Sequence, residues 1–448
     1  MSINEVIAPP LALIINQSLL TGIFPTSLKL AKVIPLFKKG DEKVFGNYRP
    51  ISLLPSVSKV IEKVVYVQVY EYFIKNKLFY RSQYGFRSGH STELAGLQFS
   101  DNILQLLDNK KTPVSVFLDL SKAFDTLDHT ILLNKLSHYG FQNNSLNWFK
   151  SYLYGRAQYV QFQNFNSIKM PLTTGVPQGS ILGPLLFIIY MNDIYTVSDK
   201  FSAILYADDT TLTSAFGSIT DCLNSAEMLS GELNKVYYWL SANRLSLNLD
   251  KTKYMVFHKS NKKINTSLNL KILNHTIEQI HSFNFLGLTI NSSMNWESHV
   301  EKISNKISKT VGILHKLKHF LPRSILLTIY NALITPHLNF GILAWGFSLN
   351  KILKLQKKAI RAIACAKYNA HTSALFKTFK ILKVDDIFRK QCLTFYFKFC
   401  NGTLPLFFHS FYTTNNSLHT YNTRQSNYIH RSELFLPVSV SGITYQLY

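Results

Sequence analysis

The chain has 448 residues, 46% of them hydrophobic, which leaves room for two or three domains with a sizeable core and excludes a disordered tail. Its net charge of +23 at pH 7 indicates a polyanionic partner, either nucleic acid or an acidic membrane surface. The N-terminus has no basic secretory segment, the apolar run Leu185–Met191 is far below the ~18 residues of a membrane span, and the four cysteines include no C-x-x-C pair. We therefore expect an intracellular protein of the nucleus and/or cytoplasm, not secreted, with no transmembrane helix, disulfide framework or zinc knuckle.

Residues 57–74 are the first segment with a strongly periodic pattern of apolar side chains. Apolar side chains recur there at the spacing of a helix, and Glu62, Lys63, Glu71 and Lys75 are among the polar positions. The apolar positions are Val57, Val60, Ile61, Val64, Val67 and Ile74. The pattern predicts an amphipathic helix that packs through these apolar positions.

Two apolar runs further along the chain end in acidic residues. The run Val114–Leu118 has the composition of a β-strand and is followed by Asp119. The run Ala203–Ala207 meets Asp208 and Asp209 and then continues with apolar and β-branched residues. This arrangement predicts a hairpin with a carboxylate pair at its bend.

The three carboxylates suit one kind of chemistry. Nucleotidyl transfer uses two divalent ions, and such ions require hard oxygen ligands. Adjacent strands of one sheet can bring Asp119, Asp208 and Asp209 together, and apolar flanks would hold them against a buried sheet. Taken singly, a strand-end Asp is more often a turn former or a cap, and an Asp-Asp pair is common on surfaces.

The last third of the chain is strongly basic. Residues 1–301 contain 28 Lys+Arg against 22 Asp+Glu, whereas residues 302–448 contain 20 against 3. Between Glu301 and Asp385 there are fifteen Lys or Arg and no acidic residue, which indicates a surface that follows a phosphate backbone rather than a solvated face of mixed charge. Two helical patterns here carry apolar residues on one side and, on the other, Lys302, Lys306, Lys309, Lys316, Lys354, Lys357, Lys358 and Arg361.

Three motifs occur in the order found in reverse transcriptases of non-LTR (LINE-type) retrotransposons. Phe117–Asp125 (FLDLSKAFD) resembles their motif A, the Gly- and Pro-rich Gly175–Pro184 (GVPQGSILGP) resembles motif B, and Tyr206–Asp209 (YADD) resembles motif C. Other segments are similar to the family's fingers blocks and primer grip: Val33–Asp41, Asn47–Ser52, Gln83–Arg87 and Phe285–Gly287. The resemblance covers roughly residues 20–380 and is nearest to jockey- or CR1-like elements of animals.

The resemblance implies an RNA-directed DNA polymerase, a nucleotidyltransferase that extends a primer 3′-hydroxyl with dNTPs on an RNA template. It assigns Asp119, Asp208 and Asp209 to two Mg²⁺ ions, which Mn²⁺ can replace, with Asp209 in a supporting role. The other matches are Lys38 and Arg49 for the triphosphate, Phe124 as the gate against a ribose 2′-hydroxyl, Gln178 and Gly179 at the nascent base pair, and Lys251 as the acid that protonates the departing pyrophosphate.

Each of these assignments has an ordinary structural alternative. Phe124 is otherwise a core side chain, Gln178 and Gly179 belong to a turn, and Lys38 and Arg49 are surface charges. Lys251 is otherwise a solvated lysine, and Lys253 is near enough to take its role.

The implied fold is α+β, a right-hand polymerase. We expect fingers in residues 1–110, a palm with an antiparallel sheet and helices in 111–290, a basic helical thumb in 291–384 and a C-terminal extension in 385–448. A helical, fingers-like excursion is expected within the palm near 130–170. RNA template, DNA primer and dNTPs would be the partners, without a membrane.

Relatives of this type carry an endonuclease domain before the polymerase and continue beyond the segment matching Asn422–Arg424, so we expect a copy truncated at both ends. Two other functions stay open. A catalytically decayed or domesticated nucleic-acid-binding remnant is favoured by truncation and opposed by the intact carboxylates. An intron maturase, the weaker alternative, should carry a helical RNA-binding extension.

Overall fold

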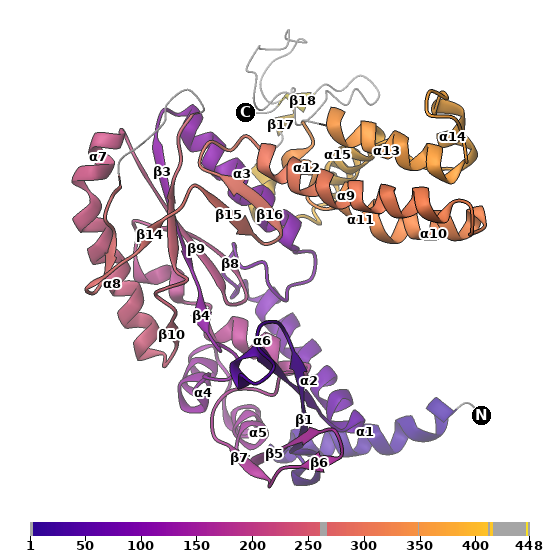
Figure 1. Ribbon diagram of the computed structural model, residues 1–448. Helices are drawn as coiled ribbons and strands as arrows, with labels where there is room; N and C mark the ends of the chain where they lie inside the picture. Colours follow the sequence, from indigo (N-terminus) through magenta and orange to yellow (C-terminus); the bar gives the residue numbers. More distant parts are fainter. Residues whose placement is uncertain (1–2, 260–266, 348, 411–412, 415–444, 447–448) are drawn as a thin grey trace.

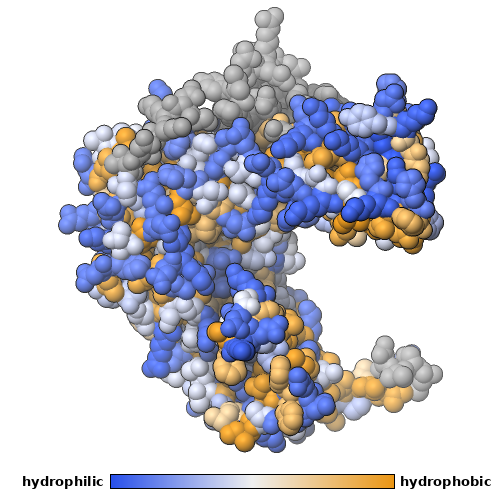
Figure 2. All heavy atoms as spheres, viewed as in Figure 1, coloured by the Kyte–Doolittle hydropathy of each residue, from blue (hydrophilic) through white to orange (hydrophobic). Residues whose placement is uncertain are grey.

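The computed structural model describes residues 3–259, 267–347, 349–410, 413–414 and 445–446, so the segment 422–424 lies outside the described residues. The fold is α+β, as predicted, and has three parts around a wide opening: a small sheet with helices near the N-terminus, a central sheet, and a helical part drawn in orange (Figure 1). Figure 2 shows this opening as a deep hollow between the helical part and the N-terminal part.

The N-terminal part is built on a sheet with the strand order β2-β1-β5-β6, in which β7 also pairs with β5. Strand β1 (Leu30–Phe37) pairs antiparallel with β2 (Tyr48–Leu53) and parallel with β5 (Arg156–Phe162). The excursion predicted near 130–170 is therefore helical only in its first half, because residues 156–162 add a strand to the open edge of β1. The remaining elements are α1 (Ile3–Thr21), η1 (Thr26–Leu28), η2 (Phe45–Asn47), α4 (His129–His138), α5 (Asn143–Leu153), β6 (Phe165–Asn166) and β7 (Met170–Leu172).

The amphipathic helix predicted over residues 57–74 is confirmed as α2 (Ser56–Lys75), but its predicted buried face is wrong. The buried apolar residues follow a four-residue spacing: Ile61, Val65, Val69 and Phe73. Val57, Val60, Val67 and Ile74 are exposed. Apolar residues surround this helix on all sides, so their spacing alone cannot select a face. The face that is buried also carries Ser58 and Glu62, which make hydrogen bonds in the interior.

The central sheet has the order β14-β11-β3-β9-β8. Strand β3 (Thr112–Leu118) runs antiparallel to β9 (Asp209–Phe216), with Leu118 opposite Thr210, and β8 (Ser202–Tyr206) forms a hairpin with β9. The predicted strand and hairpin are therefore confirmed, and both carboxylate-bearing ends meet at one end of the sheet. On the other side of β3 lies β11 (Lys253–Val256), followed by the edge strand β14 (Glu278–Gln279).

The two faces of β3 belong to different cores, as the two-residue period of a strand requires. Val114, Val116 and Leu118 pack with the almost wholly buried α6 (Leu182–Tyr190) and with α8 (Ala226–Ala242). Phe117 points to the other core, which continues into the helical part. The elements around the sheet are α3 (Thr92–Asp108), β4 (Leu120–Ser121), η3 (Ile194–Val197), α7 (Ile219–Asn224), β10 (Ser246–Leu247), β12 (Lys271–Ile272) and β13 (His275–Thr276).

The helical part follows the hairpin of β15 (Ser282–Phe285) and β16 (Leu288–Asn291). Both predicted basic helices are confirmed, as α9 (Glu297–Leu317) and α13 (Asn350–Ile363), and they pack against each other. Their predicted apolar residues are buried or half-buried: Val300, Ile303, Ile307, Val311, Leu314, Leu353, Ile360 and Ile363. The other elements are α10 (Arg323–Leu333), α11 (Thr335–Asn339), α12 (Ile342–Trp345), α14 (Ser373–Thr378), α15 (Val384–Cys400), η4 (Leu406–Ser410), β17 (Thr413–Thr414) and β18 (Tyr445–Gln446). Of the helices in the described ranges, none has the length and apolar character needed to cross a bilayer.

Candidate active site

Three carboxylates share one end of the central sheet. Asp119 follows β3, Asp208 lies in the turn after β8, and Asp209 begins β9. Burial and the negative charge of Asp119 raise the pKa of Asp208. The surrounding protein raises the pKa of Asp209 to about 6, first by excluding water and then through the charges of Asp208 and Asp119, although part of its side chain reaches solvent. The structure thus brings together the three residues predicted as metal ligands.

The carboxylate oxygens of Asp119, Asp208 and Asp209 are suitable ligands for a hard divalent cation. The three side chains are not, however, arranged around a common point. Within the described ranges, no group of three or more His, Cys, Asp and Glu side chains is placed to hold a metal ion. Lys251 Nζ lies 3.5 Å from Asp119 Oδ2 and supplies a positive charge to the site. Carboxylates are nevertheless the ligands that Mg²⁺ takes, and their mutual repulsion here is what a divalent cation would relieve.

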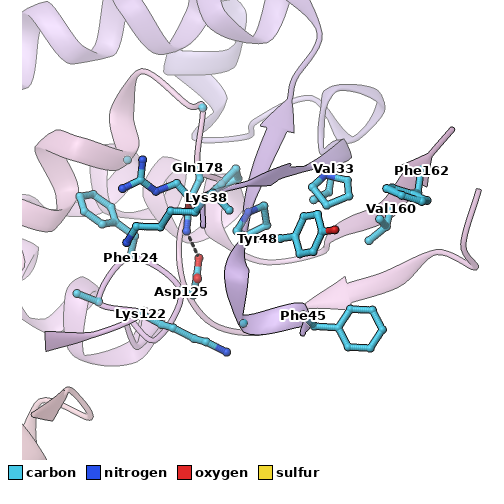
Figure 3. Close-up of a pocket in the computed structure, with 18 of the residues that line it drawn as sticks. Val33, Lys38, Phe45, Tyr48, Lys122, Phe124, Asp125, Val160, Phe162 and Gln178 are labelled. Atoms are coloured by element: carbon cyan, nitrogen blue, oxygen red, sulfur yellow. Dashed lines mark hydrogen bonds between the residues drawn. The ribbon is translucent and has the colours of Figure 1, made fainter. Parts of the chain in front are cut away.

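A cavity of about 1240 Å³ opens beside these carboxylates (Figure 3). Six of the residues predicted for the site line it, namely Lys38, Arg49, Phe124, Gln178, Gly179 and Asp208. They come from the residue after β1, from β2, the segment after β3, the loop before α6 and the turn after β8. Of the three carboxylates, Asp208 is the one on the cavity wall, so it connects the carboxylate cluster to the cavity.

One wall of the cavity is cationic. Lys38, Lys43, Arg49 and Lys122 line it, and Arg49 acts on Asp208 by lowering its pKa against the effect of burial. The register of β1 and β2 sets Leu36 opposite Arg49, and the amide of Lys38 donates to the carbonyl of Asn47 at 2.8 Å. This hairpin therefore presents cations, together with the carboxylate of Glu42, to the cavity.

Phe124 combines a packing role with exposure to the cavity. Its ring stacks on Phe187 of α6, with 4.3 Å between centroids and 24° between planes, and meets the edge of Phe86 at 6.1 Å. The residue is half-buried and lines the cavity. The same ring thus has one side in the core and another available to a bound molecule.

The Gly175–Pro184 loop is hydrogen-bonded to the segment after β3. Gln178 Nε2 donates to Asp125 Oδ1 at 2.8 Å, as Figure 3 shows, and the Val176 amide donates to the Phe124 carbonyl at 3.0 Å. A Cβ atom on Gly179 would lie 2.3 Å from the Ser52 carbonyl oxygen, so glycine is needed for the close approach of β2. The sequence prediction placed that close approach at a base pair and overlooked Asp125, although Asp125 lies inside the motif.

Glu62 is a second residue that the sequence did not reveal. It is fully buried, accepts from Ser58 Oγ at 3.0 Å, and its Oε2 accepts from the amides of Ile181 and Leu182 at 2.7 and 3.3 Å. These amides lie at the start of α6, where an anion is favourable. Glu62 therefore joins α2 to the loop that carries Gln178. A polar position on an amphipathic helix gives no local sign of such a role.

The predicted basic residues of the helical part lie on α9 and α13, away from the cavity. Lys306, Lys309 and Lys316 are exposed, as is Lys354. Lys302 is already engaged, because its Nζ donates to Asn284 Oδ1 at 3.3 Å and to Thr289 Oγ1 at 3.2 Å. On α13, Lys357 and Arg361 are half-buried, Lys358 is exposed, and Arg361 Nε donates to the Ala370 carbonyl at 2.8 Å.

Figure 2 shows apolar atoms along the edge of the helical part that borders the opening, near α10. Exposed apolar residues of α10 include Ile325 and Leu333. The basic faces of α9 and α13 and the apolar edge of α10 are thus separate surfaces of one body.

Comparison with known proteins gives matches over most of the chain. The profile of the family described as "Reverse transcriptase (RNA-dependent DNA polymerase)" matches residues 37–290. The RNA-directed DNA polymerase from mobile element jockey of Drosophila melanogaster is 29% identical over 394 residues, which are 84% of this chain and 42% of that protein. The probable RNA-directed DNA polymerase from transposon BS of the same organism is 29% identical over 404 residues, 84% of this chain and 43% of that protein.

The chain spans less than half the length of these relatives. Among solved structures, a telomerase from Candida albicans in complex with a TWJ fragment of telomeric RNA has a TM-score of 0.45 and 13% identity, over 81% of this chain and 68% of that chain.

Proposed function

Since the chain belongs to the reverse transcriptase (RNA-dependent DNA polymerase) family, we propose that it extends a primer 3′-hydroxyl with dNTPs on an RNA template. The observation that carries the proposal is the cavity that joins Asp208 to Phe124, Gln178 and a cationic wall. The jockey and BS relatives support a polymerase of a non-LTR retrotransposon, the type that the motifs predicted.

The carboxylates would hold the divalent ions. Asp119 and Asp208 are the proposed principal ligands, and Asp209 supports them from the start of β9. Bound there, two Mg²⁺ ions, or Mn²⁺ in their place, would activate the 3′-hydroxyl and neutralise the leaving pyrophosphate. The raised pKa values of Asp208 and Asp209 support this assignment, because burial first and then the charges of neighbouring carboxylates disfavour the ionised forms, and a bound cation would offset both effects.

The cationic wall would bind the triphosphate. Arg49 offers a planar fork of donors and Lys38 a point charge, and both line the cavity that Asp208 borders. Lys251, 3.5 Å from Asp119, is the proposed proton donor to the pyrophosphate, since a carboxylate partner keeps its ammonium group near the reaction.

Phe124 and Gln178 would select the nucleotide. The Phe124 ring is braced by Phe187, so it would resist displacement by a ribose 2′-hydroxyl. Gln178 is oriented by Asp125 and lies with Gly179 on the wall where a nascent base pair would stack.

The three parts of the fold suggest the fingers, palm and thumb of a right-hand polymerase. We assign fingers to residues 1–110, a palm to 111–290 with strand β5 contributed to the fingers sheet, a thumb to 291–384 and an extension to 385–448. A hybrid of RNA template and DNA primer would occupy the opening, and its phosphate backbone would extend onto the basic faces of α9 and α13. These faces carry Lys306, Lys309, Lys316, Lys354, Lys357, Lys358 and Arg361. Such a substrate makes the nucleus and/or cytoplasm the expected location.

Primer extension tests the proposal. The protein should incorporate dTTP on poly-rA/oligo-dT in the presence of Mg²⁺. Asp119→Asn and Asp208→Asn should each abolish synthesis and leave hybrid binding nearly intact, because each removes a charged metal ligand. Asp209→Asn should retain slightly more activity.

Asp199→Asn serves as the control, because the Asp199 side chain is 84% exposed and lies apart from the cluster. Wild-type rates in Asp119→Asn would remove the metal assignment. Tight hybrid binding by the wild-type protein without any synthesis would favour a nucleic-acid-binding remnant.

A further inference from the structure

A short segment, Ser82–Arg87, lies along the edge of β8 just before the carboxylate turn. The Tyr84 amide donates to the Leu205 carbonyl at 2.7 Å, and the Leu205 amide donates to the Ser82 carbonyl at 3.0 Å. Gln83 and Leu205 form a parallel bridge. The segment thereby pairs with the outer edge of β8 through a single bridge.

The side chain of Gln83 reaches from this segment to the turn itself. It is fully buried, and its Oε1 accepts from the Gly85 amide at 2.8 Å and from the Ala207 amide at 3.2 Å. Two donors converge on one atom, so that atom must be the amide oxygen and not the nitrogen. Gln83 Nε2 is buried and has no hydrogen-bond partner among the described residues. Among the described residues, the hydrogen bonds of the Gln83 side chain therefore hold the carboxylate turn and the loop that contains Gln83 itself.

The turn needs such support, because Ala207 has a φ of +56°. A residue with a Cβ atom is disfavoured in this left-handed region, where hairpin turns commonly use Gly or Asn. Asp208 follows Ala207 directly, so a return of Ala207 to negative φ would swing the Asp208 carboxylate away from Asp119. The acceptor that Gln83 offers to the Ala207 amide opposes that return.

Gly85 permits the close contact between the segment and the turn. A Cβ atom on Gly85 would lie 2.3 Å from the Ala207 nitrogen. The next residue, Phe86, touches the edge of Phe124. One segment thus borders both the carboxylate turn and the side chain proposed to select the sugar.

We propose that Gln83 is a positioning residue for the Asp208-Asp209 turn: its amide oxygen holds Ala207 in the left-handed conformation that directs both carboxylates toward Asp119. The inference rests on the proposed function, since the carboxylates matter as metal ligands only in a polymerase.

The test compares Gln83→Leu with Gln98→Leu in the full chain. Gln98 is also buried and bonds Tyr84 and Ser82 of the same segment, but it does not touch the turn. Gln83→Leu should lower kcat about 10- to 100-fold, the usual result of a misplaced catalytic group, and change the KM for dTTP little. The Mg²⁺ concentration for half-maximal rate should rise, and Mn²⁺ binding followed by electron paramagnetic resonance should weaken. Gln98→Leu should lower the melting temperature without these changes.

A rescue separates positioning from a general loss of packing. Glycine adopts positive φ without strain, so the loss caused by Gln83→Leu should be smaller in an Ala207→Gly background. If Gln83→Leu does not fold, Gly85→Ala gives a second approach, because the added Cβ atom must displace the turn and should lower kcat and Mn²⁺ binding. Gly231→Ala is its control, since nothing lies within 4 Å of a Cβ atom there.

The inference is overturned if Gln83→Leu and Gln98→Leu have equal kcat and Mn²⁺ binding, or if Gly85→Ala leaves both unchanged. An inactive wild-type protein would instead refute the proposed function, and the Mn²⁺ comparison would still report on Gln83.

Discussion

Phe124 illustrates how one side chain can be both core and substrate contact. Its ring stacks on Phe187 and lines the cavity. Replacing it with Val should open the cavity wall where a ribose 2′-hydroxyl would lie. We expect the preference for dNTP over rNTP to fall by about 10- to 100-fold in steady-state incorporation.

The ratio of the two incorporation rates is insensitive to the amount of folded protein. Phe149→Val, at a buried ring in the same core, should lower stability and leave the ratio unchanged. An unchanged ratio in Phe124→Val would show that Phe124 only fills the core.

Single residues were predictable where their position along an element carries the signal. Asp119 and Asp208 follow apolar strand runs, so a local pattern identified them. Glu62 gives no such signal, and the motif that begins at Gln83 does not indicate the partner of this residue, because both roles depend on groups more than a hundred positions away in the chain, such as Ile181 and Ala207. Only the folded chain brings these groups together.

At the scale of elements, α9 is the basic helix whose charges can be tested as a set. Replacing Lys302, Lys306 and Lys309 together with Gln should weaken binding of an RNA/DNA hybrid for all sequences about equally. The slope of log Kd against log salt should flatten by up to about 3, one per lost phosphate contact. Processivity should fall with it, and single substitutions should do little.

The control triple variant is Lys200→Gln, Lys235→Gln and Lys271→Gln, which changes the net charge equally around α8, on the side of the central sheet away from the opening (Figure 1). Equal slopes for the two triple variants would show that the α9 lysines are only a solvated face. Lys302→Gln alone should lower the melting temperature, because Lys302 bonds Asn284 and Thr289.

Helix α9 and strand β3 were predicted well, since their apolar and polar positions follow one clear period. Helix α2 was predicted as a helix with the wrong face, because valines and isoleucines occur all around it and hydrogen bonds of Glu62 decide its orientation. Strand β5 was missed within the predicted helical excursion. Strand β5 pairs with β1, which lies more than a hundred residues earlier in the chain. The local sequence pattern does not indicate so distant a partner.

At the scale of the whole molecule, the helical part shares an apolar core with the central part, and a polar contact at α3 adds to it. Glu93, in the first turn of α3, accepts from the Gly341 amide at 2.9 Å, and a cavity of about 80 Å³ lies at the same junction. Gly341 has a φ of +60°, and a Cβ atom there would lie 2.7 Å from Leu288. This polar contact therefore requires a small residue on one side and a carboxylate on the other.

Glu93→Leu should loosen this junction, because a part-buried amide loses its acceptor at a cost of about 1–3 kcal/mol. We expect lower processivity and a lower melting temperature, with addition of the first nucleotide nearly unchanged. Glu93→Gln keeps an acceptor oxygen and should behave almost as the wild type. Equal processivity in the two variants would mean that other contacts hold the helical part in place.

The parallel pairing of β1 with β5 has a consequence for how the chain is made. Ala157, which pairs with Leu30, follows it by 127 positions. At about 5–20 residues per second, a ribosome needs roughly 6–25 s to add β5 after β1. During that time the hairpin of β1 and β2 has an open edge that another nascent chain can pair with. The proposed fingers, residues 1–110, would thus not be a unit of folding, and a fragment that ends before β5 should aggregate when it is released.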